Sequence, residues 1–288
     1  MALLDRIELG DHVCWTVEDD DVRRDEIAGV LHAGLLSGHK VIYSGNDPDT
    51  VLAAVERRGV VLRAVLASGQ LQAVTAEAGY LAGGSFDPEG LIGQLRAEKE
   101  RSRAEGYRGL RVIGDMSWAR RRVPDAERLE WYETRCNAVF ADGYVMGICA
   151  YDKGLFDPVL LRRLALAHPG AAGPLLPFDP ESSLRIRRTE QPYGLWISGE
   201  ADLSNRHALQ AMVEDALLRR GGEPVVTIDL TALRFADTAA ARVLLQAAAG
   251  AGRMHVVGCS PALVRLLFFH GAGLIPGLVV TPGYLNDG

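Results

Sequence analysis

The sequence lacks any long apolar run. No stretch of about 18 consecutive apolar residues occurs, and the first residues do not form the apolar segment of a signal peptide. We therefore expect a folded protein of the cytoplasm that does not enter a membrane. Cysteine is also scarce: the four cysteines are isolated and form no Cys-x-x-Cys pair, which argues against a zinc ribbon or a disulfide framework.

An excess of basic residues is missing too. Lys and Arg number 31 against 37 Asp and Glu, so the formal net charge is −6. The two basic clusters, residues 120–122 and 185–188, are short, and solvated faces or charges that flank a linker explain them more simply than a nucleic-acid patch. We therefore predict no direct binding to nucleic acid.

A proline-rich segment divides the chain. Residues 168–183 contain four prolines and two glycines, which disfavour both helix and central strand. With 48% hydrophobic residues the 288-residue chain can fill two cores. The predicted division is a first domain at 1–168, a linker at 169–183 and a second domain at 184–288.

The first domain alternates short apolar segments with helical patterns. This alternation predicts an α/β fold with a mostly parallel sheet and flanking helices. The predicted strands are 12–17, 40–44, 71–75, 110–115 and 144–150, and the predicted helices are 22–36, 49–58, 88–105, 125–140 and 158–167.

Four segments of this domain carry a family resemblance. They are Gly10-Asp11-His12-Val13-Cys14, residues 34–43, Gly114-Asp115-Met116-Ser117-Trp118, and residues 148–152 leading to His168-Pro169. Together they resemble the MEDS family of sensory domains from methanogen and methylotroph regulators, which is related to RecA- and KaiC-like ATPases. The resemblance implies a RecA-like sheet, the sensing of small molecules such as hydrocarbon derivatives, and control of transcription.

Nucleotide chemistry is not expected from the loop after the first strand. A phosphate-binding loop needs glycines and a lysine, whereas residues 16–26 contain neither and carry six carboxylates. Asp115 resembles the magnesium-binding aspartate of such ATPases, and we interpret it as a retained structural position that lines a ligand crevice. We therefore predict no enzyme activity and no cofactor.

Seven residues form the candidate sensory site: His12, Cys14, Trp15, Asp115, Trp118, Cys149 and Tyr151. His12 and Cys14 share one face of a strand, and with Cys149 or His168 they could bind a metal or sense redox state. Because no compact ligand spacing occurs in the sequence, we predict no metal, and buried packing is the simpler interpretation. The aromatic residues either line a hydrophobic pocket at the carboxyl ends of the strands or belong to the core.

The second domain carries its own motifs. Leu195–Leu203 ends in Gly-Glu-Ala-Asp-Leu, an apolar strand enters Ile228-Asp229-Leu230, and Phe235-Ala236-Asp237-Thr238 follows. A helix at 204–219, a strand at 253–258 and a helix at 261–269 complete the pattern. This order resembles the STAS domain of anti-sigma factor antagonists. The resemblance implies that a partner kinase phosphorylates Thr238, that Asp237 is its motif neighbour, and that Asp202 lies near the site.

Thr238 has two interpretations. The family usually continues with a second hydroxyl residue and a glycine, but this chain has Ala239 and Ala240, which leaves Thr238 as the sole hydroxyl of the motif. Thr238 is then either a phosphorylation switch or simply the N-cap of the following helix. A phosphate would add about −1.5 to −2 charge beside Asp237 and weaken the binding of a docked partner.

These observations predict a non-enzymatic signalling protein. Its sensory first domain would respond to a small-molecule ligand, and its STAS-like domain would bind an anti-sigma factor of the serine/threonine kinase type through Asp202, Asp237 and Thr238. One alternative is a degenerate RecA-like nucleotide-binding enzyme with a regulatory STAS domain. Another is a phosphorylation-independent STAS scaffold that packs against copies of itself as a homo-oligomer.

Overall fold

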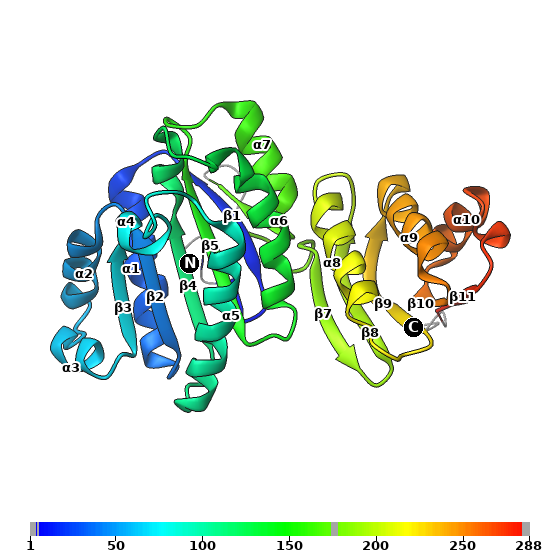
Figure 1. The fold of residues 1–288 in the computed structure, drawn as a ribbon, viewed down its shortest axis with the longest axis horizontal. Helices are drawn as coiled ribbons and strands as arrows, with labels where there is room; N and C mark the ends of the chain where they lie inside the picture. The colour runs from blue at the N-terminus through cyan, green and yellow to red at the C-terminus, as the bar shows by residue number, and fades with distance from the viewer. Residues whose placement is uncertain (1–3, 5, 174–177, 284–288) are drawn as a thin grey trace. The chain divides into compact units, whose positions relative to one another are not determined.

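The computed structural model describes residue 4, residues 6–173 and residues 178–283. The chain forms two compact units, Met1–Phe178 and Asp179–Gly288 (Figure 1). The boundary between the units lies inside the segment that the sequence predicts as a linker. The predicted α/β class, with a parallel sheet first and a second, smaller α/β unit after it, is confirmed.

The first unit is built on a parallel sheet of six strands in the order β3-β2-β4-β5-β1-β6. The strands are β1 His12–Val17, β2 Lys40–Gly45, β3 Leu71–Thr75, β4 Leu110–Asp115, β5 Val145–Asp152 and β6 Gly170–Ala172. The helices are α1 Asp20–Leu36, α2 Pro48–Arg57, α3 Leu62–Ala67, α4 Ala76–Gly79, α5 Pro88–Ala104, α6 Leu129–Phe140 and α7 Pro158–Ala167, with 3-10 turns η1 Met116–Arg120 and η2 Ala126–Arg128.

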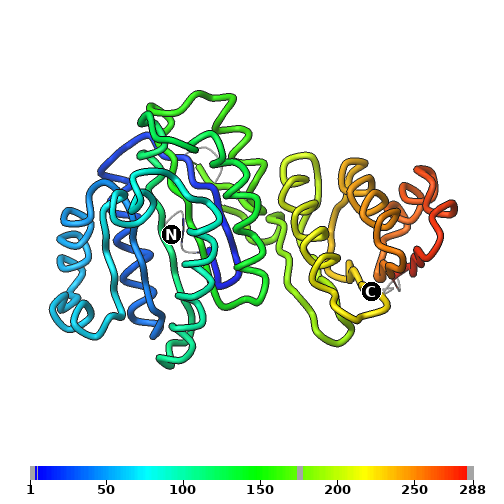
Figure 2. The backbone as a smooth tube through the Cα atoms, viewed as in Figure 1, coloured from blue at the N-terminus to red at the C-terminus, as the bar shows by residue number. Residues whose placement is uncertain are grey.

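Each face of this sheet carries its own core. Helices α1 and α2 contribute to one core, and helices α5, α6 and α7 contribute to the other. Because successive side chains of a strand point to opposite faces, Val13 and Trp15 of β1 enter the first core while Cys14 enters the second. The backbone trace shows β1 running between its neighbours in the interior of the sheet (Figure 2). Residues of β1 are therefore shielded on both faces.

Two sequence expectations need correction here. Gly170–Ala172 is not linker but strand β6, which pairs in parallel with β1. A Cβ atom at Gly170 would lie 2.8 Å from the ring of buried Phe178, so a glycine lets this edge strand pack. The predicted helix 125–140 begins as α6 only at Leu129, because Asp125 adopts a left-handed φ of 64° that interrupts the helix.

The second unit has a five-stranded sheet in the order β11-β10-β9-β8-β7. The strands are β7 Arg185–Glu190, β8 Tyr193–Ala201, β9 Val226–Ala236, β10 Met254–Cys259 and β11 Leu278–Pro282. Only β7 pairs antiparallel, with β8. The helices are α8 Arg206–Leu218, α9 Thr238–Ala251 and α10 Pro261–Phe269, with a 3-10 turn η3 Ala272–Leu274, and α9 packs between α8 and α10.

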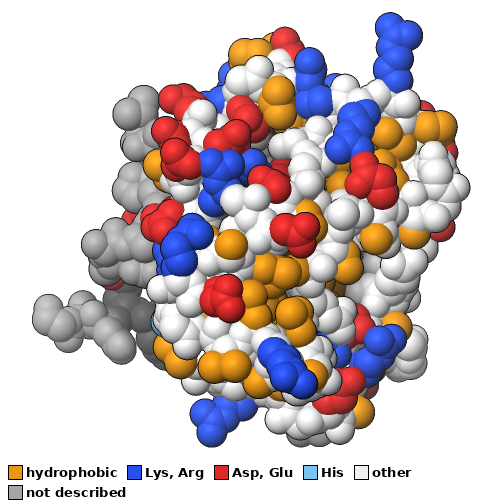
Figure 3. Space-filling view, turned by 90° about the vertical axis from the view of Figure 1, so that its left-hand side faces the viewer, with side chains coloured by type: hydrophobic (Ala, Val, Ile, Leu, Met, Phe, Trp, Pro, Cys, Tyr) orange, Lys and Arg blue, Asp and Glu red, His pale blue; other side chains and the backbone are white. Residues whose placement is uncertain are grey.

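The surface of the first unit is mixed in charge. Acidic and basic side chains alternate over the part of the surface that Figure 3 displays, and hydrophobic side chains lie between them. That face therefore presents no continuous basic patch among the coloured residues. None of the helices in the described part of the chain combines the length and hydropathy that a membrane crossing requires.

Candidate functional site

Asp237 holds together the junction between β9 and α9. Its Oδ1 accepts a hydrogen bond from the Ala240 amide at 2.9 Å, which makes it the N-cap of α9. Its Oδ2 accepts from the Leu203 amide at 3.0 Å, and its own amide donates to the Ala201 carbonyl at 3.1 Å. One carboxylate thus joins the start of α9 to the loop after β8.

Asp202 lies in that same loop. Its Oδ1 accepts from the amide and the hydroxyl of Ser204, at 2.7 and 2.5 Å. Asn205 braces the loop from below, since its Oδ1 accepts from the Asp202 amide and its Nδ2 donates to the Glu200 carbonyl. The structure therefore brings the loop of Asp202 to Asp237, as the resemblance implies, and adds Asn205, which the sequence pattern did not single out.

Thr238 is exposed and is the first residue of α9. Because Asp237 is the N-cap, the interpretation of Thr238 as the cap is wrong. Thr238 lines an open groove of about 480 Å³ between α8 and α9, together with Leu203, Arg206, His207, Gln210, Ala239, Arg242, Val243 and Gln246. Two of the lining residues, Arg206 and Arg242, are basic.

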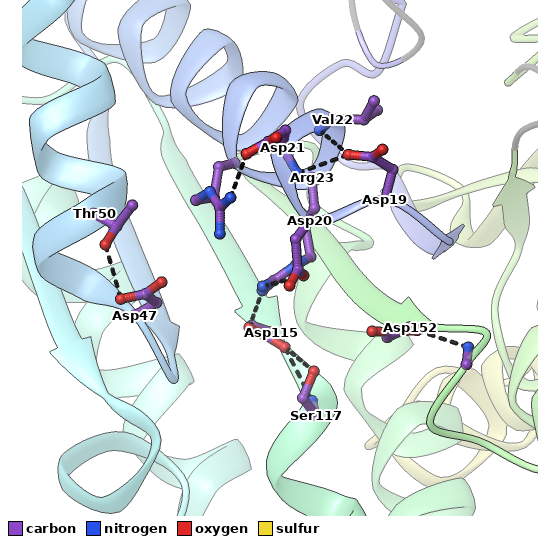
Figure 4. A network of polar contacts seen from close by, with 12 residues as sticks. Asp19, Asp20, Asp21, Val22, Arg23, Asp47, Thr50, Asp115, Ser117 and Asp152 are labelled. Carbon is purple, nitrogen blue, oxygen red and sulfur yellow. Dashed lines mark hydrogen bonds and ion pairs between the residues drawn. The ribbon is translucent and has the colours of Figure 1, made fainter.

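A polar network covers the carboxyl ends of the first unit's strands (Figure 4). Arg23 of α1 forms ion pairs with buried Asp115 at the end of β4 and with Asp20. Asp115 Oδ1 also accepts from the amide and the hydroxyl of Ser117, at 3.0 and 2.6 Å. Burial alone would lower the pKa of Arg23, but Asp115 and Asp20 raise it. Asp115 is fully buried, and both of its carboxylate oxygens have protein partners, Arg23 and Ser117.

The acidic loop before α1 is engaged in local contacts. Asp19 caps α1 by accepting from the amides of Asp21 and Val22. Three further acids of this stretch pair with basic side chains: Asp21 with Arg24, Asp25 with Arg58, and Glu18 with Lys153. These carboxylates thus surround the N-terminus of α1, which is the position where a phosphate-binding loop would hold a nucleotide phosphate.

The predicted aromatic site residues do not meet in one place. Trp15 is buried in the core beneath α1 and α2, whereas Trp118 and Tyr151 are buried in the core on the opposite face. Trp118 stacks on Tyr80, with 5.2 Å between ring centroids. Trp15 and Trp118 therefore belong to the hydrophobic cores, which is the second of the two interpretations of the aromatic residues.

Four polar side chains converge in the second core: His12 of β1, Glu133 of α6, Cys149 of β5 and His168 after α7. We call them the buried cluster; all are buried, with at most 7% of any residue exposed. Glu133 Oε2 lies 3.5 Å from His12 Nε2, 3.4 Å from His168 Nε2 and 3.4 Å from Cys149 Sγ. Cys149 Sγ lies 3.5 Å from His12 Nε2.

The electrostatics of the cluster follow from its burial. Burial alone would raise the pKa of Glu133, but His168 and His12 beside the carboxylate lower this pKa below its usual range. Burial and the neighbouring His168 lower the pKa of His12. Burial and Glu133 raise the pKa of the Cys149 thiol and of the Tyr151 phenol well above their ordinary values.

The structure thus brings together three residues that the sequence offered as candidates and a fourth, Glu133, that it did not. His12, Cys149 and His168 meet, while Cys14, the cross-strand neighbour of Cys149, stands outside the cluster. Glu133 carries no sequence signal beyond being an acid on the apolar face of a predicted helix. The prediction of no metal rested on the absence of compact ligand spacing along the sequence. In the folded structure the ligand atoms of these four side chains nevertheless lie close together.

Family models match each of the two units. Residues 11–169 match the family model described as MEDS, methanogen/methylotroph, DcmR sensory domain, and residues 184–274 match the one described as Mlab, STAS domain. No curated protein sequence matches the chain.

Among solved structures, the flagellar accessory protein FlaH from Methanocaldococcus jannaschii is 12% identical, with a TM-score of 0.40 over 60% of this chain and 74% of that one. The KaiC-like protein PH0186 from Pyrococcus horikoshii OT3 is 12% identical, with a TM-score of 0.41 over 66% and 77%.

Proposed function

The chain belongs to the MEDS family, and from this premise we propose that it is a two-part signalling regulator whose STAS unit acts as an anti-sigma factor antagonist. In its unphosphorylated form the STAS unit binds an anti-sigma factor of the serine/threonine kinase type, which then releases its sigma factor. Phosphorylation of Thr238 reverses the interaction. Transcription is therefore controlled through a protein partner and without direct contact to nucleic acid.

The observation that carries this proposal is the setting of Thr238. Thr238 is exposed at the first turn of α9, and the residue that caps this helix is Asp237. A kinase can therefore reach the hydroxyl without unfolding the helix. The match of residues 184–274 to a STAS domain supplies the class of partner.

A phosphate at Thr238 would be tolerated by the fold and felt by a partner. The helix N-terminus stabilises an exposed anion by about 0.3–1 kcal/mol. Arg242 lies one helical turn further along α9 and lines the same groove, which favours an anion at the earlier position. The added charge of about −1.5 to −2 stands beside Asp237, so a partner surface docked there meets a desolvated anion and loses affinity.

The first unit supplies the sensory input in this proposal and performs no catalysis. Its first loop has no glycine or lysine for a triphosphate, and Arg23 already neutralises Asp115, the residue that would hold magnesium. A small-molecule ligand of this unit acts by binding one conformational state of the protein more tightly than another.

The test is a binding assay with the full chain. The serine/threonine-kinase-type anti-sigma factors of the same organism are purified one by one, and their affinities for the wild type and for Thr238→Glu and Thr238→Ala are measured by calorimetry. We expect one of them to bind the wild type and Thr238→Ala, and to bind Thr238→Glu at least tenfold more weakly.

Thr231→Ala is the matched control, because Thr231 is also exposed on the same unit but does not line the groove. It should bind like the wild type. If no kinase-type anti-sigma factor binds, the antagonist role is wrong. If one binds and Thr238→Glu binds it equally well, the switch is wrong and a phosphorylation-independent scaffold is the better account.

A further inference from the structure

The buried cluster has its histidines held in defined tautomers. Asn137 uses its Nδ2 to donate to the carbonyls of Thr134 and Ala167, at 3.0 and 2.8 Å, so its Oδ1 faces His12 Nδ1 at 2.8 Å. An amide oxygen only accepts, so His12 Nδ1 carries the proton. In the neutral imidazole, the Nε2 atom of His12 therefore carries the lone pair and faces Glu133 and Cys149.

The second histidine is fixed in the same way. His168 Nδ1 lies 2.8 Å from the Leu164 carbonyl, which again only accepts, and His168 Nε2 has no hydrogen-bond partner among the described residues. Tyr151 donates its hydroxyl to Glu133 Oε1 at 2.5 Å, which leaves Oε2 to face both imidazoles. Ligating histidines and carboxylates in metal sites are oriented by outer hydrogen bonds of this kind.

The result is a set of acceptors that face one another. With neutral imidazoles, two lone pairs and a carboxylate oxygen meet within a buried core, and the thiol proton of Cys149 cannot serve all three. Buried acceptors without donors destabilise a fold. A cation at the centre removes this cost.

The spacing and chemistry of the four ligand atoms select the kind of cation. A tetrahedral zinc ion with bonds of about 2.0–2.3 Å separates its ligand atoms by roughly 3.3–3.8 Å. Four of the ligand pairs lie 3.4–3.5 Å apart, and all of the atoms lie within 4.8 Å of one another. Two imidazoles, one thiol and one carboxylate are the ligands of zinc and its first-row neighbours, not of magnesium or calcium.

We propose that His12 Nε2, Glu133 Oε2, Cys149 Sγ and His168 Nε2 bind one divalent transition-metal ion of the zinc type in the first unit. Cys149 binds as the thiolate, and its proton is released to solvent when the metal enters. Four protein ligands fill a tetrahedral shell, so the site is closed and stabilises the fold. The ion links β1, α6 and β5 to the residue that follows α7. It stabilises the native state by an amount that rises with the logarithm of the ratio of the metal concentration to the dissociation constant.

The test uses the full-length protein, stripped with a chelator and then titrated with Zn²⁺ or Co²⁺ alone. We expect one metal ion per chain by elemental analysis. Cobalt should give a tetrahedral ligand-field spectrum with a thiolate-to-metal charge-transfer band. The temperature of unfolding should rise on metal addition.

Cys149→Ser and Cys136→Ser form the matched pair, because both remove a buried thiol from the same core and only Cys149 belongs to the cluster. We expect Cys149→Ser to lose the charge-transfer band and to weaken metal binding at least tenfold, and Cys136→Ser to retain both. If the variants do not fold, the cobalt spectrum of the wild type decides by itself. A folded wild type that binds no metal, or that gives cobalt no thiolate band, would overturn the site and leave an imidazolium-carboxylate network in its place.

Discussion

The carboxylate of Asp237 should contribute measurably to the stability of the STAS unit. Replacement by alanine removes the cap of α9 and the bond to the Leu203 amide. Loss of an N-cap costs about 0.5–2 kcal/mol. A hydrogen bond to a charged group is worth about 1.5–3 kcal/mol, less here because the side chain is only half-buried. Together these terms predict a loss of about 2–3 kcal/mol for Asp237→Ala.

Urea unfolding can measure this loss if it is followed by hydrogen exchange of peptides from residues 179–283, so that the first unit does not contribute. The midpoint should fall while the dependence on urea stays unchanged. Asp237→Asn keeps one acceptor and should recover about half of the loss. Glu190→Ala removes an exposed acid of the same unit and should shift stability by less than about 0.5 kcal/mol. An Asp237→Ala variant as stable as Glu190→Ala would refute the assigned role.

Three further outcomes are expected. Burial and two neighbouring arginines lower the pKa of His39 to about 4. The unfolded state therefore binds the proton first, and the free energy of unfolding falls by at most about 3 kcal/mol as the pH drops from about 6.5 towards 4. His39→Asn should flatten this slope in unfolding experiments at stepped pH. Gly147→Ala places a Cβ atom 2.6 Å from the ring of Phe140, and thermal unfolding should show a loss of about 1–3 kcal/mol. Arg23→Ala leaves buried Asp115 unpaired and should cost about 3–5 kcal/mol, much of which Arg23→Ala with Asp115→Asn should restore.

Local order in the first unit could be predicted closely from the sequence. The predicted bounds are confirmed for strands β1, β3 and β4 and for helix α7. A short apolar segment between two helical patterns indicates both the type of element and the residues at which it begins and ends. Strand β6 could not be predicted in this way. Its three small residues lie among prolines and glycines, and only pairing with β1 makes them a strand.

The buried cluster shows what a single sequence does not contain. Glu133 lies 121 positions from His12 and 35 from His168, and nothing along the chain relates them. Parallel pairing of β1 with β5 puts His12 beside the strand of Cys149, and the packing of α6 on this face adds Glu133. In contrast, the setting of Thr238 was predicted because its motif is contiguous, although the sequence did not show that Asp237 is the cap.

Phosphosite mapping of the protein isolated from its native host tests directly whether Thr238 is phosphorylated. Mass spectrometry of peptides that span β9 and α9 should find phosphate on Thr238 and none on Thr227 or Thr231 of β9, which do not line the groove. The modified fraction should fall when the kinase-type anti-sigma factor is deleted. A Thr238 that carries no phosphate under any growth condition, in cells where that anti-sigma factor is active, would contradict the proposed switch.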